Sequence, residues 1–209
     1  MKSLDAVGLT VSRETIEKLD AFSALLTRWN RKINLVSPRE IDRLWDRHIL
    51  DSAQVFPHVP DDVTSWADVG SGAGLPGLVC AILAAEKNRD LVVDLIESDQ
   101  RKCVFLRQAS RELGLETRVH AERVEAVAPK TFQIITARAF ASVPKILTLT
   151  APLRGETTRY LLLKGRSYES ELTEAEQSWK LHASRIPSRT DPDGMILDIT
   201  EVYPRHDVP

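Results

Sequence analysis

The segment best suited to chemistry is a glycine-rich stretch that follows a short apolar run. Residues 68–77 read Asp-Val-Gly-Ser-Gly-Ala-Gly-Leu-Pro-Gly. Glycines at a strand-to-helix turn let the backbone approach a ligand closely and point amide groups at it. The next apolar run ends at Glu97, whose carboxylate can there accept both ribose hydroxyls of an adenosine. The pattern predicts a nucleoside cofactor bound by Gly70, Gly72, Gly74 and Glu97.

Two kinds of cofactor fit this pattern. Residues 72–77 also match GxGxxG, and Glu97 lies twenty residues further on, as in the dinucleotide fingerprint. A nicotinamide-dependent oxidoreductase is therefore an alternative. Three features favour S-adenosylmethionine instead. Asp68 precedes the first glycine, Pro76 delays the start of the next helix, and little chain remains for a separate substrate domain.

The elements that must position this site alternate along the chain. Strands are predicted at residues 65–69, 91–97, 117–120, 132–136, 159–163, 181–186 and 195–203, and helices at 78–87, 100–113, 143–151 and 169–179. Such alternation predicts a mostly parallel sheet with helices on both faces. The last two strands have no helix between them, so they can pair antiparallel. The expected fold class is α/β, a Rossmann-like sheet of the S-adenosylmethionine-dependent methyltransferase type with an antiparallel last strand.

The beginning of the chain has a different pattern. Ser12 can cap a helix whose apolar residues recur at helical spacing as far as Trp29, and a second helix is expected over residues 41–53. We therefore expect residues 1–62 to form an N-terminal helical cap. Residues 63–209 are expected to form the methyltransferase domain as one compact unit.

Bulk properties exclude several classes of protein. The formal net charge of −2 means that any RNA-binding surface must be a local basic patch. Cys80 and Cys103 lie in apolar-periodic stretches and are expected to be buried reduced thiols. We expect no metal site, because no histidine or cysteine spacing resembles one. Residues 1–12 do not resemble a signal peptide and no run approaches the ~20 apolar residues of a membrane span, so we expect a cytoplasmic protein. No dimer seam is evident, and a monomer is expected.

Blocks scattered over nearly the whole chain resemble one family. The blocks are residues 28–30 with 34–35, 47–52 (Arg-His-Ile-Leu-Asp-Ser), 68–77, 102 with 105–107, 123–125, 137–141 (Ala-Arg-Ala-Phe-Ala) and 163–165. The chain resembles the bacterial 16S ribosomal RNA guanine-N7 methyltransferases (the RsmG family, or glucose-inhibited division protein B). Blocks 47–52 and 137–141 are specific to that family, whereas the glycine loop is not. The departures are small: Ala73 replaces a common proline, and Glu97 a common aspartate.

The resemblance implies methyl transfer from S-adenosylmethionine to N7 of guanine 527 in 16S ribosomal RNA. The partner would be that RNA, the small ribosomal subunit or an assembly intermediate. Gly70 and Leu75 would line the methionine–adenosine site, and Glu97 would hold the ribose. The resemblance further places two residues beside the adenine, Val124 and Glu125.

The resemblance also places Arg138 beside the cofactor and the target base. Guanine N7 carries an in-plane lone pair and no proton, so its methylation needs no general base. Catalysis then reduces mainly to alignment, and Arg138 is expected to position the substrate. A non-catalytic RNA-binding or ribosome-assembly factor on the same scaffold is the other alternative.

Two basic clusters, at residues 28–47 and 101–111, are candidates for phosphate contacts. His48 lies on an apolar stripe, so a buried structural role stands beside a role toward substrate. The residues predicted to bind RNA are Arg28, Arg31, Lys32, Arg47, His48, Lys102, Arg107 and Lys164.

Overall fold

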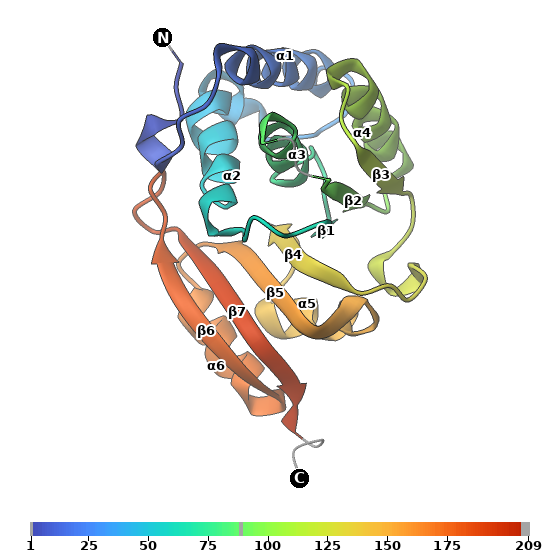
Figure 1. Ribbon diagram of the computed structural model, residues 1–209, viewed down its shortest axis with the longest axis vertical. Helices are drawn as coiled ribbons and strands as arrows, with labels where there is room; N and C mark the ends of the chain where they lie inside the picture. Colours follow the sequence, from blue (N-terminus) through green and yellow to red (C-terminus); the bar gives the residue numbers. More distant parts are fainter. Residues whose placement is uncertain (1, 88–89, 206–209) are drawn as a thin grey trace.

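The computed structural model describes residues 2–87 and 90–205, which fold around a seven-stranded sheet (Figure 1). Residues 1, 88–89 and 206–209 lie outside the described residues. They include the first residue of the predicted helical cap and the last residues of the predicted methyltransferase domain. The strands are β1 (Ser65–Val69), β2 (Val92–Ile96), β3 (Thr117–His120), β4 (Phe132–Arg138), β5 (Arg154–Lys164), β6 (Trp179–Pro187) and β7 (Met195–Pro204). All seven predicted strands are present. β5 begins five residues earlier than predicted, at Arg154 rather than residue 159.

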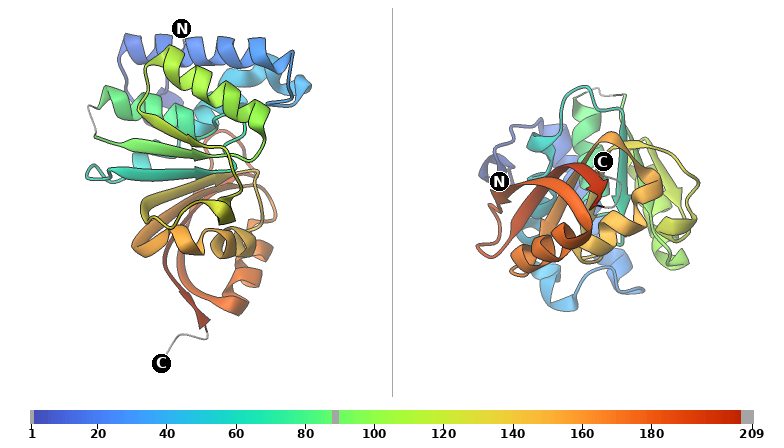
Figure 2. Two further views of the ribbon diagram at one scale, coloured as in Figure 1. Left: turned by 90° about the vertical axis from the view of Figure 1, so that its right-hand side faces the viewer. Right: turned by 90° about the horizontal axis from the view of Figure 1, so that it is seen from below.

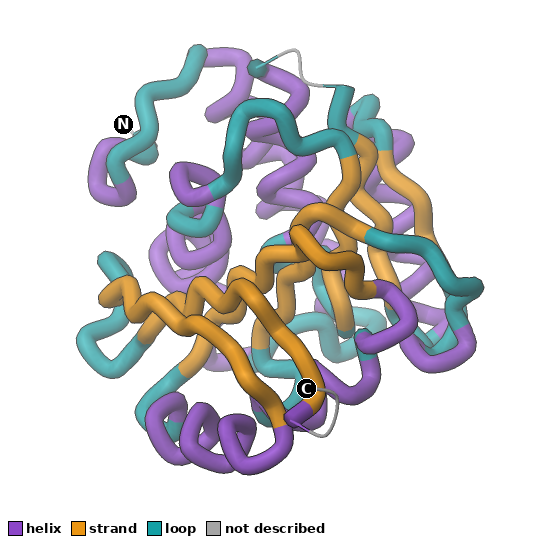
Figure 3. The backbone as a smooth tube through the Cα atoms, turned by 60° about the horizontal axis from the view of Figure 1, so that its bottom comes forward, coloured by secondary structure: helices purple, strands orange, loops and turns teal. Residues whose placement is uncertain are grey.

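The strand order is β3-β2-β1-β4-β5-β7-β6. The first five strands are mutually parallel, and β7 is antiparallel to both β5 and β6. The predicted sheet with an antiparallel ending is thus confirmed, and Figure 3 shows the β6–β7 pair extending it. The chain runs outward from β1 in one direction and returns to β4 on its other side. In such sheets, ligands bind at the carboxyl ends of the strands where the order reverses, which is here between β1 and β4.

Helices cover both faces of the sheet. They are α1 (Arg13–Asn30), α2 (Asp51–Ala53), α3 (Gly77–Glu86), α4 (Gln100–Leu113), α5 (Val143–Leu149) and α6 (Tyr168–Ser178). α1, α3 and α4 lie on one face and α5 and α6 on the other (Figure 2). α1 begins as predicted, because the Ser12 hydroxyl oxygen accepts the Thr15 N–H at 3.2 Å.

The second predicted helix is less regular than its sequence pattern indicates. Residues 41–53 were expected to form one helix, but a 3₁₀ helix (Pro38–Arg43) leads into a π-helix (Trp45–Leu50) and then into α2. A π-helix is rare and is frequent at functional sites. Here it carries Arg47 and His48, whose contacts with β4 are described below, and such long-range contacts are not visible in the apolar pattern.

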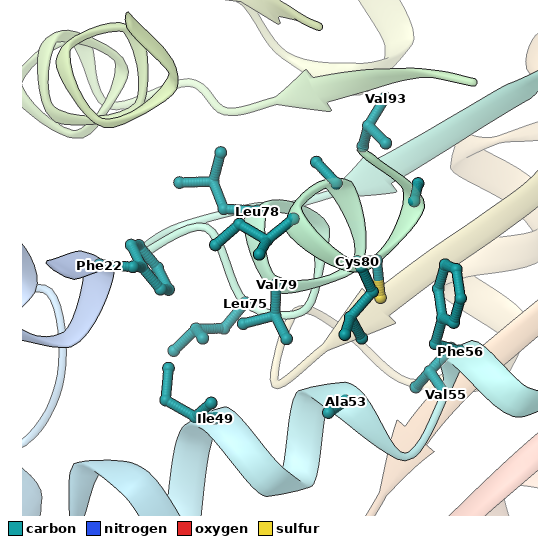
Figure 4. Packing of buried hydrophobic residues seen from close by; sticks show 14 of the residues in the cluster. Phe22, Ile49, Ala53, Val55, Phe56, Leu75, Leu78, Val79, Cys80 and Val93 are labelled. Carbon is teal, nitrogen blue, oxygen red and sulfur yellow. The ribbon is translucent and has the colours of Figure 1, made fainter. Parts of the chain in front are cut away.

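α3 is the centre of the larger hydrophobic cluster. Its residues from Gly77 to Ala84 are all buried, because the sheet covers one side and the N-terminal helical segment (residues 2–62) covers the other. Figure 4 shows Phe22 of α1 and Ile49 of the π-helix directed at Leu78 and Val79 of α3. The helical segment and the sheet therefore share one core on this face.

The two cysteines match expectation, and the tryptophans belong to the core or pack against it. Cys80 and Cys103 are buried and unbonded to each other, and burial raises the pKa of both thiols, so they stay protonated. Trp66 is fully buried, whereas Trp29 and Trp45 are partly exposed and pack against the core. In residues 2–87 and 90–205, no helix is long and apolar enough to cross a membrane, and no group of three or more His, Cys, Asp or Glu side chains could hold a metal ion.

Candidate active site

The glycine loop joins β1 to α3 through backbone conformations that residues with a side chain rarely adopt. Gly70, Gly72 and Gly74 have φ angles of +68°, +53° and +79°, in the left-handed region that favours glycine. A Cβ on Gly74 would lie 2.4 Å from the Leu78 side chain, whereas one on Gly72 would meet only the Gly70 carbonyl oxygen, at 3.6 Å. Gly74 therefore serves the turn itself. Gly72 leaves open space beside the backbone for a ligand.

The Asp68 carboxylate fixes the position of the glycine loop through hydrogen bonds. One carboxylate oxygen accepts the Gly77 N–H at 3.2 Å, and the other accepts the Thr136 hydroxyl at 2.8 Å. The Trp66 indole N–H donates in turn to Thr136 at 2.9 Å. Burial raises the pKa of Asp68 to about 6, against the lowering effect of these hydrogen bonds. Asp68 therefore links β1 both to the first residue of α3 and to β4.

Glu97 follows β2 and faces the loop. Its carboxylate oxygens accept the N–H groups of Gly72, at 2.9 Å, and Asp99, at 2.8 Å. Each carboxylate oxygen has a second lone pair, so the group can still accept hydroxyl donors. The side chain of Glu97, which is longer than the common aspartate, is thus held by a hydrogen bond from the glycine loop.

A cavity of about 700 Å³, the first cavity, runs along the carboxyl ends of β1, β2 and β4. This size is typical of small-molecule and cofactor sites. It brings together nine of the predicted site residues, Gly70, Gly72, Leu75, Glu97, Val124, Glu125, Arg138, His48 and Lys102. Gly74 is the predicted cofactor residue that does not line it. Four charged residues that were not predicted as site residues also line it: Glu40, Glu122, Arg123 and Lys145.

Arg138 ends β4 and locks it to the N-terminal helical segment. Its Nη2 donates to the Arg47 carbonyl oxygen at 3.0 Å and to His48 Nδ1 at 2.8 Å, and its Nε lies 3.0 Å from an Asp51 carboxylate oxygen. The family block 47–52 and the block 137–141 therefore meet in space. The role of Asp51 as partner was not predicted, because nothing in the sequence pairs it with Arg138.

His48 is held as a neutral acceptor in this arrangement. The ring is buried, and Nδ1 must be free of a proton in order to accept from Arg138. Burial and then the charge of Arg138 lower the pKa of His48, against the raising effect of Glu40, whose carboxylate lies 3.3 Å from Nε2. The ring therefore orients Arg138 at the wall of the first cavity.

A second cavity of about 460 Å³ lies on the other side of residues 138–141, which line both cavities. Phe140, within this shared wall, is one of three exposed large hydrophobic side chains in the described part of the chain. Ala139 adopts φ +50°, unusual for a residue with a side chain. No role for Phe140 was predicted from the sequence, although an aromatic residue inside a family-specific block is a signal for one.

Two cations predicted to bind RNA line the second cavity, where each is paired. Arg47 Nη1 lies 3.0 Å from Asp191, and Lys164 Nζ lies 2.8 Å from Glu171. The Lys164 side chain is only 9% exposed. Their charges are therefore balanced within the protein.

The remaining predicted cations are on the outer surface. Arg28 and Arg31 line a shallow hollow along α1 that shares no lining residue with either cavity, and Arg28 lies 3.5 Å from Glu112. Lys32 is exposed just past α1, and Arg107 is exposed on α4. The structure thus separates these four from the cavities, whereas Lys102 is at the first one.

Comparison with known proteins identifies the family. The sequence profile described as rRNA small subunit methyltransferase G matches residues 15–193. The chain belongs to this family. Its relatives include the ribosomal RNA small subunit methyltransferases G of Gluconobacter oxydans, 48% identical over 192 residues (92% of this chain, 96% of the relative), and of Cereibacter sphaeroides, 44% identical over 191 residues (91% and 93%).

Among solved structures, the magnesium protoporphyrin IX methyltransferase of Synechocystis with bound SAM is similar, with a TM-score of 0.58 and 12% identity over 92% of this chain and 98% of that one. At this identity the likeness concerns the fold alone. The predicted family and the predicted fold class are confirmed, and the family is one of methyltransferases of small-subunit ribosomal RNA. Membership also favours S-adenosylmethionine over a nicotinamide as the cofactor of the glycine loop.

Proposed function

We propose that this enzyme transfers a methyl group from S-adenosylmethionine to N7 of guanine 527 in 16S ribosomal RNA. The family supports the reaction class and the RNA, and the resemblance described above suggests the nucleotide. One observation favours N7 as the acceptor atom: the histidine at the first cavity, His48, is engaged by Arg138 through Nδ1. An acceptor atom that carries no proton needs no base from such a site.

Other acceptor atoms fit less well. Methylation at a pyrimidine carbon commonly requires a nucleophile such as a thiolate, and both Cys80 and Cys103 are buried with raised pKa values. The chemistry of guanine N7 is simpler. Its lone pair forms the bond to the methyl carbon while the carbon–sulfur pair leaves with sulfur, and no proton moves.

The first cavity suits the donor. The open side of Gly72 admits a ligand against the backbone, and the unused lone pairs of Glu97 can accept ribose hydroxyls. In the proposal Val124 and Glu125 flank the adenine, and Gly70 and Leu75 contact the methionine portion. The bound cofactor supplies an activated methyl group.

The contribution of the protein to the rate is then mainly alignment, worth roughly 7–11 kcal/mol in well-oriented systems. Arg138 is suited to this role, since two hydrogen bonds and an ion pair hold its guanidinium at the cavity wall. Its positive charge is already balanced by Asp51, so it need not oppose the charge that develops on the methylated base.

The RNA would lie across the open side of the first cavity. Lys102, Arg123 and Lys145 line this cavity and can contact phosphates near the target. The exposed cations of α1 and α4 would extend the contact and make binding sensitive to salt. We propose a monomeric enzyme, and a ribosomal substrate favours the cytoplasm.

The test is to incubate the purified enzyme and labelled S-adenosylmethionine with small subunits from cells lacking this activity. Mass spectrometry of the RNA is expected to find one 7-methylguanine, at position 527, in each methylated subunit. Methylation of another atom or position would overturn the finer assignment. Binding of cofactor and subunits without any methyl transfer would favour an assembly factor.

A further inference from the structure

The proposed binding of the cofactor does not involve the second cavity. Residues 138–141 separate it from the first cavity, so a ligand in it would be next to one in the first. It is lined by β5, β7 and the π-helix region, on the side of the wall away from the glycine loop. A methyl acceptor must approach the donor from the side that the cofactor does not fill.

The charges around the second cavity form three ion pairs. Each of its three cations contacts a carboxylate, Arg138 with Asp51, Arg47 with Asp191, and Lys164 with Glu171. Such a rim has no net charge, which makes it poorly suited to a phosphate. It does present donors and acceptors side by side, which suits an uncharged group with both kinds of hydrogen-bonding atom.

Phe140 gives this space an aromatic wall. The side chain is 36% exposed although it is next to the buried glycine loop. Its ring rests on Gly70, since a Cβ on that glycine would come within 2.3 Å of the ring. An exposed ring fixed over the loop and bordering both cavities offers a stacking face for a planar ligand.

We propose that the second cavity holds the acceptor guanine, stacked on Phe140, with its Watson–Crick edge toward the ion pairs. This inference rests on the proposed function and names the substrate pocket for it. N7 shares an edge with O6, while N1–H and the 2-amino group are on the Watson–Crick side. Recognition at the carboxylates therefore leaves N7 free to point past Phe140 at the first cavity. Unpaired RNA bases are commonly read in this way, by stacking and by edge contacts.

The test compares Phe140→Leu with Tyr203→Leu. Tyr203 is an exposed aromatic residue on β7 that lines neither cavity, so the pair matches loss of one exposed ring at two places. Stacking on one base is worth roughly tenfold to hundredfold in affinity. We expect Phe140→Leu to lower kcat/KM for unmodified small subunits by that factor when S-adenosylmethionine is saturating. Because Phe140 also borders the first cavity, the affinity for S-adenosylhomocysteine is measured separately and is expected to fall by a smaller factor. Tyr203→Leu is expected to change neither, and Phe140→Trp to restore activity.

A second measurement uses a defined small probe. 7-Methylguanosine 5′-monophosphate, added to enzyme saturated with S-adenosylhomocysteine, is expected to shift the ring resonances of Phe140 in the wild type but not those of Tyr203. Unchanged kcat/KM in Phe140→Leu, or probe shifts away from residues 138–141, would overturn the proposal.

Failure of the proposed function gives a different result from failure of the pocket. If the wild type methylates small-subunit RNA at an atom other than guanine N7, the reaction is wrong, whatever Phe140 does. If it forms 7-methylguanine and Phe140→Leu does so equally well, only the pocket is wrong.

Discussion

The two cavities are built in different ways. The predicted cofactor side of the first is the glycine loop, of which residues 70–73 and 75 line the cavity, with Glu97 held by a hydrogen bond from the Gly72 backbone. The second is formed by side chains that are distant in sequence: Arg138 reaches a partner 91 residues away, and Arg47 one 144 residues away. The glycine-loop side of the first cavity therefore depends on local backbone geometry, whereas the second cavity depends on how the N-terminal helical segment docks against β4 and the loop before β7.

This difference separates two kinds of sensitivity. A side chain added to the glycine loop has no room on one side and fills the cofactor space on the other, so cofactor binding should suffer first. A change in the ion pairs leaves the glycine loop intact, so cofactor binding should persist while transfer fails. The following variants test this division.

The largest effect is expected from Gly72→Val. The new side chain projects into the space left beside the backbone and should reduce affinity for S-adenosylhomocysteine by at least roughly 100-fold, as measured by calorimetry. Gly114→Val is the matched control: Gly114 ends α4 at φ +63° with no atom within 4 Å of an added Cβ. Both variants should lose similar stability from the left-handed backbone, about 1–3 kcal/mol. Equal affinities in the two would contradict the placement of the cofactor.

Arg138→Ala should come next. Loss of an aligned positioning group is expected to lower turnover on small subunits by roughly 100-fold, with cofactor affinity within threefold of wild type. Arg159→Ala is the control, because Arg159 also forms an ion pair from a strand, with Asp198, but lines neither cavity. A parallel loss of cofactor binding in Arg138→Ala would show that the two sides are not separable.

The effect of pH on the rate of methyl transfer should be smaller than the effect of either substitution. With no general base, the rate is expected to be flat from pH 7 to pH 8.5. His48 has an ordinary value of 6.5 and a lowered pKa in the fold, so its protonation, which removes the Nδ1 acceptor for Arg138, should reduce the rate only below that pH. Since the unfolded chain binds that proton first, the fold also loses stability as pH falls through 6.5. A limb at pH 6.5 or above in kcat/KM would instead indicate a titrating base.

The smallest effect is expected for Arg31→Gln on α1. One lost phosphate contact should weaken subunit binding by about twofold at low salt and reduce the slope of log affinity against log salt by about one. Lys180→Gln, on the exposed edge strand β6, is the control and should leave both quantities unchanged. Identical slopes for the two variants would remove α1 from the RNA contact.

Local pattern was sufficient for much of this protein. The Ser12 cap, the glycine loop, Glu97 at the end of its strand and the antiparallel last pair each depend on neighbours in sequence or on simple alternation, and all are in place. The family blocks added the residues around Arg138. The prediction of one helix over residues 41–53 was wrong, because a 3₁₀ helix and a π-helix precede the short α2 there.

What the tertiary structure alone decided is how the blocks meet. The pairing of Arg138 with Asp51 and His48, the pairing of Arg47 with Asp191 and the second cavity behind Phe140 all join segments that are distant in sequence. The physical reason is that ion pairs between distant segments depend on the position of whole elements, and burial of α3 between the sheet and the N-terminal helical segment sets that position. The sequence by itself predicted where a cofactor could bind, because the glycine loop and the two carboxylates that hold it, Asp68 and Glu97, are visible in local pattern. Where the acceptor would bind depended on the packed molecule.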